Sequence, residues 1–284
     1  MSTLVLDAPL LHRGLGDGGG VSCDGPALLA MADALRSDYR GAAPYAHAVL
    51  SGLVADDVLL AVVAELQNVP DHVLQVTRSR RIVKRETPDV HTLGPATQAL
   101  AGALDGPEFV AFLGRLTGIE GLVADVSHHA AGLHETRTGG FTKVHTDFKR
   151  HPVTRLHHRV NVLLYLNPGW LPEHGGSLEL WPADMSALGR TVLPELGTMV
   201  VFETSAHTPH GLPAPVAGPE GTARRSLAAY YYSADRPARE RTGGGLGSYR
   251  ARPGEGRWVS LPTPKELAMS LVPERIRRLR DIRR

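Results

Sequence analysis

The chain has 284 residues, 42% of them hydrophobic, which is enough for one large domain or two small ones with a buried core. Its 31 lysines and arginines nearly balance its 29 acidic residues, so the overall charge does not predict nucleic acid as a partner. A single cysteine, Cys23, excludes an internal disulfide framework and is typical of a reducing compartment.

No targeting or membrane segment is expected. The first residues lack a basic stretch followed by a continuous apolar core, which a signal peptide requires. No apolar run approaches the length of a membrane span. These patterns predict a cytoplasmic protein.

The N-terminal part of the chain is predicted to be mainly helical. Residues 1–42 are expected to form a weakly ordered leader, which includes a helical stretch near residues 26–36. The elements expected next are a short strand at 45–50, an amphipathic helix at 55–67 and two helices within 93–116 that separate near Gly106-Pro107.

The pattern changes at about residue 122. Short strand candidates then recur to about residue 233, separated by Gly- and Pro-containing turns. Helices followed by a run of strands predict a mainly β (α+β) fold, with a β-barrel or jelly-roll core that N-terminal helices cover. We expect a single domain at 43–236, with its jelly-roll core at about 122–233.

A basic C-terminal extension at 237–284 is expected to end in a helix at 272–284. That helix suits either a solvated element docked on the body of the protein or a contact with a membrane surface or an acidic partner.

His145 and Asp147 are the first candidates for a chemical role. Residues two apart on a strand share a face, so both side chains can reach one metal ion. A histidine, a carboxylate and a second histidine are the ligands that an open Fe(II) site uses. About one His-x-Asp pair is expected by chance in a chain with 14 histidines, so the pair needs support from other segments.

The strand predicted at 159–167 offers such support. Its alternation places Val160, Val162 and Leu164 on an apolar face that must pack in a core. Arg159, Asn161, Leu163 and Tyr165 share the other face, which looks either to solvent or into a ligand pocket, and we favour the pocket.

A second strand is predicted to begin at Arg224. Arg224 and Ser226 share one face, where they can hold a carboxylate through charge-assisted hydrogen bonds. An edge strand with both arginines in water is the alternative. A shift by one residue would exchange Arg224 with Arg225, and the position of Ser226 favours Arg224.

The third metal ligand must come from the segment between these strands. His207 and His210 both lie there, and spacing alone does not choose between them.

Taken together, the motifs resemble the prolyl 4-hydroxylase-like branch of the Fe(II)/2-oxoglutarate-dependent dioxygenases. The resemblance runs from about residue 125 to 233 and rests on several motifs in one order. They are Gly139-Gly140-Phe141, His145-Thr146-Asp147-Phe148, Arg159-Val160-Asn161, Tyr165-Leu166-Asn167, Gly175-Gly176, Leu178, Leu180-Trp181, His210-Gly211, Pro213, and Arg224 with Ser226-Leu227.

The resemblance implies a double-stranded β-helix (a cupin-like jelly roll) with iron bound by His145, Asp147 and His210. It favours His210 over His207 because the distal histidine of similar sequences directly precedes a glycine. It also implies that Arg224, assisted by Ser226, pairs with the distal carboxylate of 2-oxoglutarate, which Tyr165 also contacts. Asn161 is expected at the metal-binding end of this co-substrate.

The cofactors implied are Fe(II), 2-oxoglutarate and O2, with ascorbate as a supporting reductant. The expected reaction is hydroxylation of an unactivated C–H bond of an amino acid, a peptidyl residue or a small natural product, with release of succinate and CO2. Related halogenases lack the carboxylate ligand, so Asp147 favours hydroxylation, while desaturation or cyclisation stays open. A zinc hydrolase and a non-catalytic binding protein are alternatives from other classes. We expect a small-molecule or peptidyl substrate, no nucleic acid and no membrane span, and the sequence does not predict an oligomeric state.

Overall fold

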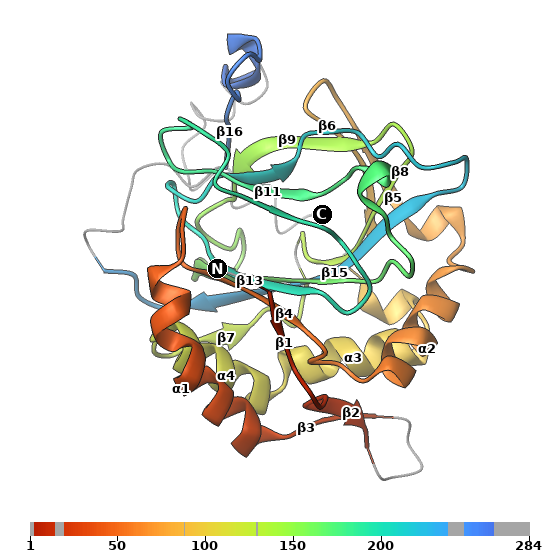
Figure 1. The fold of residues 1–284 in the computed structure, drawn as a ribbon, viewed down its shortest axis with the longest axis vertical. Helices are drawn as coiled ribbons and strands as arrows, with labels where there is room; N and C mark the ends of the chain where they lie inside the picture. Colours follow the sequence, from red (N-terminus) through yellow and green to blue (C-terminus); the bar gives the residue numbers. More distant parts are fainter. Residues whose placement is uncertain (1–2, 15–19, 88, 129, 238–246, 264–284) are drawn as a thin grey trace.

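The computed structural model describes residues 3–14, 20–87, 89–128, 130–237 and 247–263. Most strands lie on one hydrogen-bonded path, in the order β1-β4-β13-β10-β15-β8-β6-β9-β14-β11-β12. The path curls over, so that β9, β14 and β11 form a layer above β4, β13 and β15, and the helices cover the far side of the lower layer (Figure 1). This is the mainly β jelly-roll architecture with N-terminal helices that the sequence predicts.

The helices predicted between residues 55 and 116 are confirmed. The break between the last two falls at Gly106-Pro107, because proline suits the first turn of a helix and ends the preceding one. The described α-helices are α1 (Gly25–Gly41), α2 (Asp56–Leu66), α3 (Pro95–Asp105) and α4 (Pro107–Thr117).

Within residues 3–14 and 20–42, the structure contains regular elements where the sequence predicts a weakly ordered leader. In α1, the side chains of Leu28, Ala32 and Tyr39 are fully buried, and Asp24 caps the helix by accepting a hydrogen bond from the backbone N–H of Ala27. Because these apolar residues recur at helical spacing, they give α1 one buried face, which packs against α4. The predicted terminal helix at 272–284 lies outside the described residues.

The strands predicted from residue 122 onward are also present. The strand expected at 45–50 is β4, which pairs with β13. The bounds are β1 (Leu4–Val5), β2 (Leu11–Arg13), β3 (Val21–Cys23), β4 (His47–Ser51), β5 (Gln75–Arg78), β6 (Ile82–Thr87), β7 (Val123–Ala124), β8 (Gly132–Arg137), β9 (Phe141–Thr146), β10 (His157–Tyr165), β11 (Leu178–Leu180), β12 (Arg190–Val192), β13 (Met199–Glu203), β14 (His210–Leu212), β15 (Ala223–Ser233) and β16 (Ser248–Tyr249).

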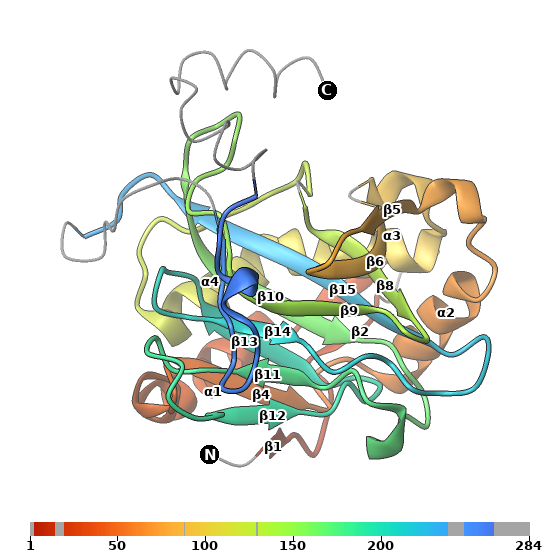
Figure 2. The same cartoon turned by 90° about the horizontal axis from the view of Figure 1, so that it is seen from above.

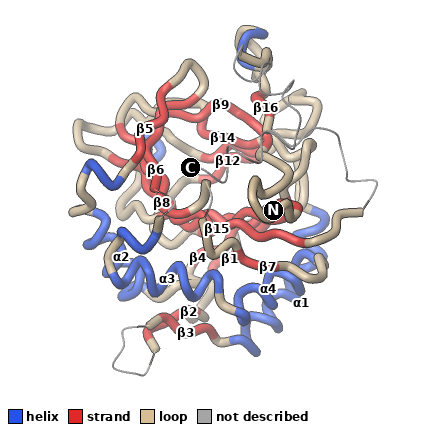
Figure 3. The backbone as a smooth tube through the Cα atoms, turned by 180° about the vertical axis from the view of Figure 1, so that it is seen from behind, coloured by secondary structure: helices blue, strands red, loops and turns tan. Residues whose placement is uncertain are grey.

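The β5–β6 hairpin was not expected from the sequence. Its strands carry several charged side chains, so the alternation of apolar residues is weak there. β6 nonetheless joins β8 to β9 and thereby connects the two layers. Figure 3, which shows the molecule from behind, places β5, β6 and β8 together at one side of the strand layers.

The two faces of β10 pack into two different apolar clusters. Val160, Val162 and Leu164 belong to the large cluster that the helices cover, whereas Tyr165 belongs to a smaller cluster that includes Leu178 and Leu180 from β11. The predicted alternation of β10 is therefore confirmed from Val160 to Tyr165.

Arg159 departs from that alternation. The register of β10 against β15 shifts between His158 and Val160, and this bulge changes which side chain faces inward. Arg159 donates hydrogen bonds to the Ser233 hydroxyl and the Asp235 carbonyl. His158 takes the inner position instead and stacks on Tyr232, so the expected place of Arg159 on the pocket face is wrong.

None of the helices in the described ranges has the length and apolar character that a bilayer crossing requires.

Candidate metal and co-substrate site

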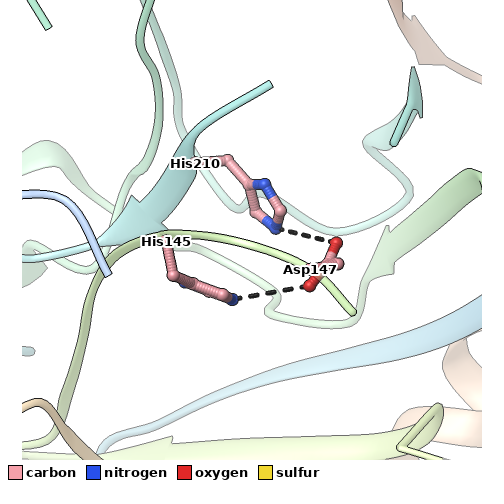
Figure 4. A group of neighbouring side chains, drawn as sticks. All are labelled: His145, Asp147 and His210. Atoms are coloured by element: carbon pink, nitrogen blue, oxygen red, sulfur yellow. Dashed lines mark ion pairs between the residues drawn. The ribbon is translucent and has the colours of Figure 1, made fainter. Parts of the chain in front are cut away.

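His145, Asp147 and His210 come together where β9 and β14 pair. His145 lies on β9, Asp147 follows that strand, and His210 begins β14, directly opposite His145. The candidate ligand atoms lie within 4.8 Å of one another. Figure 4 shows the two imidazole rings pointing at the carboxylate, with Nε2 of His145 3.6 Å and Nε2 of His210 3.5 Å from its oxygens.

The backbone fixes the orientation of both imidazoles. Nδ1 of His145 donates to the carbonyl of Lys143 at 3.0 Å, and Nδ1 of His210 donates to the carbonyl of Thr208 at 3.2 Å. Because a carbonyl only accepts, each Nδ1 carries the proton and each Nε2 offers its lone pair toward Asp147. This support is typical of histidines that bind a metal ion.

The charge states suit a divalent cation. Burial lowers the pKa of His210 to about 4, so the ring is neutral at pH 7. Burial opposes ionisation of Asp147, but the neighbouring His210 and His145 outweigh it and lower the pKa of the carboxyl. A neutral imidazole and a carboxylate are the forms in which these side chains bind metals.

Asn161 supports the carboxylate ligand. Its amide nitrogen donates to Oδ2 of Asp147 at 2.7 Å, and the side chain is buried. Asn161 thus lies beside the candidate metal ligands, and its observed contact is with one of them. Such a hydrogen bond holds the carboxylate in place before a metal binds.

His207 does not join the cluster. It is exposed in the loop before β14, where its backbone N–H donates to the Ser205 hydroxyl.

The close approach of β9 explains why a glycine, Gly211, follows His210. A methyl group there would lie 2.9 Å from the Thr142 carbonyl oxygen and 2.9 Å from Cα of Val144, so β9 leaves no room for a side chain.

Arg224 and Tyr165 form a second polar site on the inner face. Arg224 is 4% exposed, its guanidinium carbon lies 4.8 Å from the centre of the Tyr165 ring, and its Nε donates to the Gly176 carbonyl at 2.6 Å. Ser226 lies opposite Tyr165 in the register of β15 and β10, so all three side chains share one face.

The two sites are connected by β10. Asn161 touches Asp147 and Tyr165 touches Arg224, and the two residues stand four apart on the same face of this strand. At the usual rise of a strand, about 13 Å of backbone separates the two residues, and long side chains that reach toward each other make the distance between the two sites shorter.

Arg225 has a different partner. Its Nε lies 2.9 Å from Oε2 of Glu135, which is 2% exposed and also binds Arg85 and Arg137. In the sequence analysis, a shift of the strand register by one residue would have exchanged the roles of Arg224 and Arg225. This ion-pair network shows that Arg225 binds the buried Glu135 and so stabilises the fold.

His158 is a neighbour of the site that the strand predicted at 159–167 did not include. Its ring lies 4.7 Å from that of Tyr230 and 5.0 Å from that of Phe148, the residue after Asp147. Burial lowers its pKa, so the ring stays neutral. Only the bulge in β10 brings it inward, and no local pattern in the sequence marks that bulge.

Two histidines and a carboxylate held by a jelly roll form the ligand arrangement that is typical of non-haem iron oxygenases. The family model described as the 2OG-Fe(II) oxygenase superfamily matches residues 131–232, which include every residue of the two sites above. That segment is therefore similar to the oxygenases of this superfamily, and together with the cluster of two histidines and a carboxylate it supports an oxygenase enzyme that uses Fe(II) and 2-oxoglutarate.

Solved structures show the same fold. A prolyl hydroxylase from Trichoplax adhaerens, in complex with a hypoxia-inducible factor peptide, matches with a TM-score of 0.53 and 16% identity over 73% of this chain and 91% of that one. A prolyl 4-hydroxylase from Phytophthora capsici matches with a TM-score of 0.52 and 19% identity over 90% of this chain and 76% of that one. Comparison with curated proteins found no significant match.

Proposed function

We propose that the protein is a dioxygenase that hydroxylates an unactivated C–H bond of an amino acid, a peptidyl residue or a small natural product. 2-Oxoglutarate is then converted to succinate and CO2. The proposal rests on the convergence of His145, Asp147 and His210 within 4.8 Å, together with the buried Arg224 on β15.

The donor set fits Fe(II). Two imidazole nitrogens and one carboxylate would hold the ion and leave other positions open for a co-substrate and dioxygen. Bound Fe(II), with 2-oxoglutarate as the source of electrons, would supply the activation of dioxygen that attacks the C–H bond. Asp147 fills the position that halogenases leave free for chloride, which favours hydroxylation, while desaturation and cyclisation are alternative outcomes of the same chemistry.

Arg224 is the residue that favours a dicarboxylate. Among the described residues it contacts the Tyr165 ring and the Gly176 carbonyl, and no carboxylate neutralises it. A buried guanidinium without a counter-charge is costly, so this site favours an anion. We propose that Arg224 binds the distal carboxylate of 2-oxoglutarate, because the arginine can donate two parallel hydrogen bonds to it.

Tyr165 and Ser226 are proposed to complete that carboxylate site. The Tyr165 hydroxyl is buried and has no hydrogen-bond partner among the described residues. It can donate to the same carboxylate, and Ser226 lies directly opposite on β15. Asn161 is proposed to hold Asp147 and to border the metal-binding end of the co-substrate.

The catalytic unit is proposed to be residues 43–236, with the C-terminal extension beyond it. The substrate class is proposed by likeness alone, since the Trichoplax neighbour holds a peptide.

Succinate release tests the function. The full chain is incubated with Fe(II), 2-oxoglutarate, O2 and ascorbate, while amino acids, peptides and pathway intermediates are screened by mass spectrometry. A substrate that gains one oxygen as succinate forms supports the proposal, and the Asp147→Ala variant should form neither product. Bound iron without turnover on any compound would favour a non-catalytic binding protein, and turnover of an ester or amide with zinc alone would favour a hydrolase.

A further inference from the structure

Residues 247–263, here called the C-terminal strap, lie beyond the matched oxygenase segment and return to the metal site. β16 in this strap pairs with β9, Ser248 opposite Thr146 and Tyr249 opposite His145. The other edge of β9 is occupied by β14, where His210 lies opposite His145. Tyr249, His145 and His210 therefore stand in one row across three strands.

Residues directly opposite each other in an antiparallel pair point to the same face. Because His145 points to the metal position, Tyr249 does so as well. The ring centre of Tyr249 lies 5.7 Å from that of His145. On the other side of His145, the ring centre of His210 lies 4.8 Å from that of His145. The strap thus adds an aromatic side chain to the row that carries two candidate ligands.

The strap approaches the ligand segment closely. A methyl group on Gly247 would overlap the Thr146 carbonyl oxygen and lie 3.1 Å from the carbonyl carbon of Asp147. The Ser248 and Thr146 hydroxyls lie 3.1 Å apart, and the backbone N–H of Arg250 donates to the Val144 carbonyl at 2.8 Å. This packing fixes the position of Tyr249 beside His145.

Side chains from three strands or turns hold the strap. Arg81, in the turn between β5 and β6, lies with its guanidinium carbon 5.0 Å from the centre of the Tyr249 ring and donates to the carbonyls of Trp258 and Leu261. Two ion pairs join the strap to β9 and β11, Lys143 with Glu255 at 2.6 Å and Arg252 with Glu179 at 3.1 Å. In Figure 2 this blue segment runs across the strands β9, β14 and β11.

Of the three candidate ligands, His145, which Tyr249 adjoins, has the most exposed side chain. The side chain of His145 is 25% exposed, against 10% for Asp147 and 8% for His210. Arg224 and Tyr165 lie deeper and are almost fully buried. A co-substrate held by Arg224 therefore occupies the inner side, and the second substrate must approach from the side of His145.

We propose that Tyr249 forms the outer wall of the metal site, and that the substrate reaches the metal along its ring. An aromatic wall suits the apolar, C–H-bearing part of a substrate, since it packs against carbon without competing for hydrogen bonds. Tyr249 then acts as a positioning residue for the substrate. This role in substrate binding rests on the proposed function.

The wall itself is tested on metal-free protein, with diethyl pyrocarbonate as the probe and peptide mass spectrometry as the readout. The reagent modifies accessible neutral imidazoles. Tyr249→Ala should raise the modification rate of His145 several-fold, whereas Tyr249→Phe, which keeps the ring, should leave it at the rate of the unaltered protein. Trp258→Ala is the matched control, because it removes an aromatic side chain of the same strap that is 44% exposed.

A second variant, Glu255→Gln, weakens the ion pair with Lys143 and should expose His145 to a smaller degree. If His145 reacts equally fast in the Tyr249→Ala and unaltered proteins, the wall does not exist. With a substrate from the succinate screen, Tyr249→Ala should raise KM more than it lowers kcat, and an unchanged KM would overturn the positioning role. Because the first readout needs no iron, co-substrate or turnover, a failure of the proposed function would leave its result standing.

Discussion

His145 on β9 and His210 on β14 lie directly opposite each other, with ring centres 4.8 Å apart and both Nε2 atoms toward Asp147. The sheet register brings together ligands that are 65 positions apart in the chain, so the metal site depends on β14 keeping its place against β9.

Removal of a ligand should abolish metal binding. His145→Ala or His210→Ala removes a nitrogen that points at the site, and we expect affinity for Mn(II), measured by calorimetry, to fall by more than about 100-fold, since even loss of an outer support costs 10- to 100-fold. His207→Ala is the control and should bind as the unaltered protein does. Retained metal binding in the His210 variant would move the third ligand to another residue.

Gly211 should tolerate no side chain. A methyl group there meets the backbone of Thr142 and Val144 at 2.9 Å, which must push β14 away from β9. We expect Gly211→Ala to lower the free energy of unfolding by about 1–3 kcal/mol, as overpacking does, and to weaken metal binding. Thermal unfolding measures the first effect. Gly102→Ala in α3, where a methyl group meets nothing within 4 Å, is the matched control and should not destabilise.

The two adjacent arginines should behave differently. Arg224→Ala removes the proposed partner of the 2-oxoglutarate carboxylate, and loss of a charge-assisted hydrogen bond should raise the co-substrate concentration needed for half-maximal succinate release by about 10- to 100-fold. Arg225→Ala removes one partner of buried Glu135 and should instead lower the free energy of unfolding by about 1–3 kcal/mol. The reverse pattern would contradict the strand register.

Asn161 should tune metal affinity through Asp147. Asn161→Ala removes the 2.7 Å hydrogen bond to the carboxylate, and we expect Mn(II) affinity to fall by about 10-fold while the fold remains. Circular dichroism provides the check on folding. Metal affinity that does not change would mean that Asp147 is held by other contacts.

The metal-free protein should lose stability on mild acidification. Burial, and next the charge of Lys84, lower the pKa of His134 to about 4, below its usual value near 6.5. The unfolded chain therefore binds more protons than the folded protein between these values. The contribution of His134 is complete above pH 6.5 and is lost as the pH falls toward 4.

His134→Gln isolates that contribution. Between pH 7 and pH 5 the variant should lose about 2 kcal/mol less stability than the unaltered protein, measured by urea unfolding. Asp125, whose pKa is lowered to about 2, does not titrate in this window and cannot produce the difference. Equal pH slopes in the two proteins would show that His134 is protonated to the same extent in both states.

The sequence by itself determined the class of fold and the order of the motifs. Apolar residues at helical spacing predicted α2, α3 and α4, and Gly106-Pro107 marked the break between the last two. Alternation with period two predicted that His145 and Asp147 share a face and separated the apolar from the polar face of β10. These features are local, so the pattern of neighbouring residues specifies them.

Tertiary structure decided everything that depends on which strands pair and where they shift. A one-residue bulge in β10 turned Arg159 out and brought His158 in, because a strand's side chains change face with each residue. The buried Glu135 pairs with Arg225, whereas Arg224 lies against the Tyr165 ring on the other face of β15. Pairing of β16 with β9 placed Tyr249 beside His145 from more than a hundred residues away. Strand pairing over such distances is set by packing and register, which local periodicity does not encode.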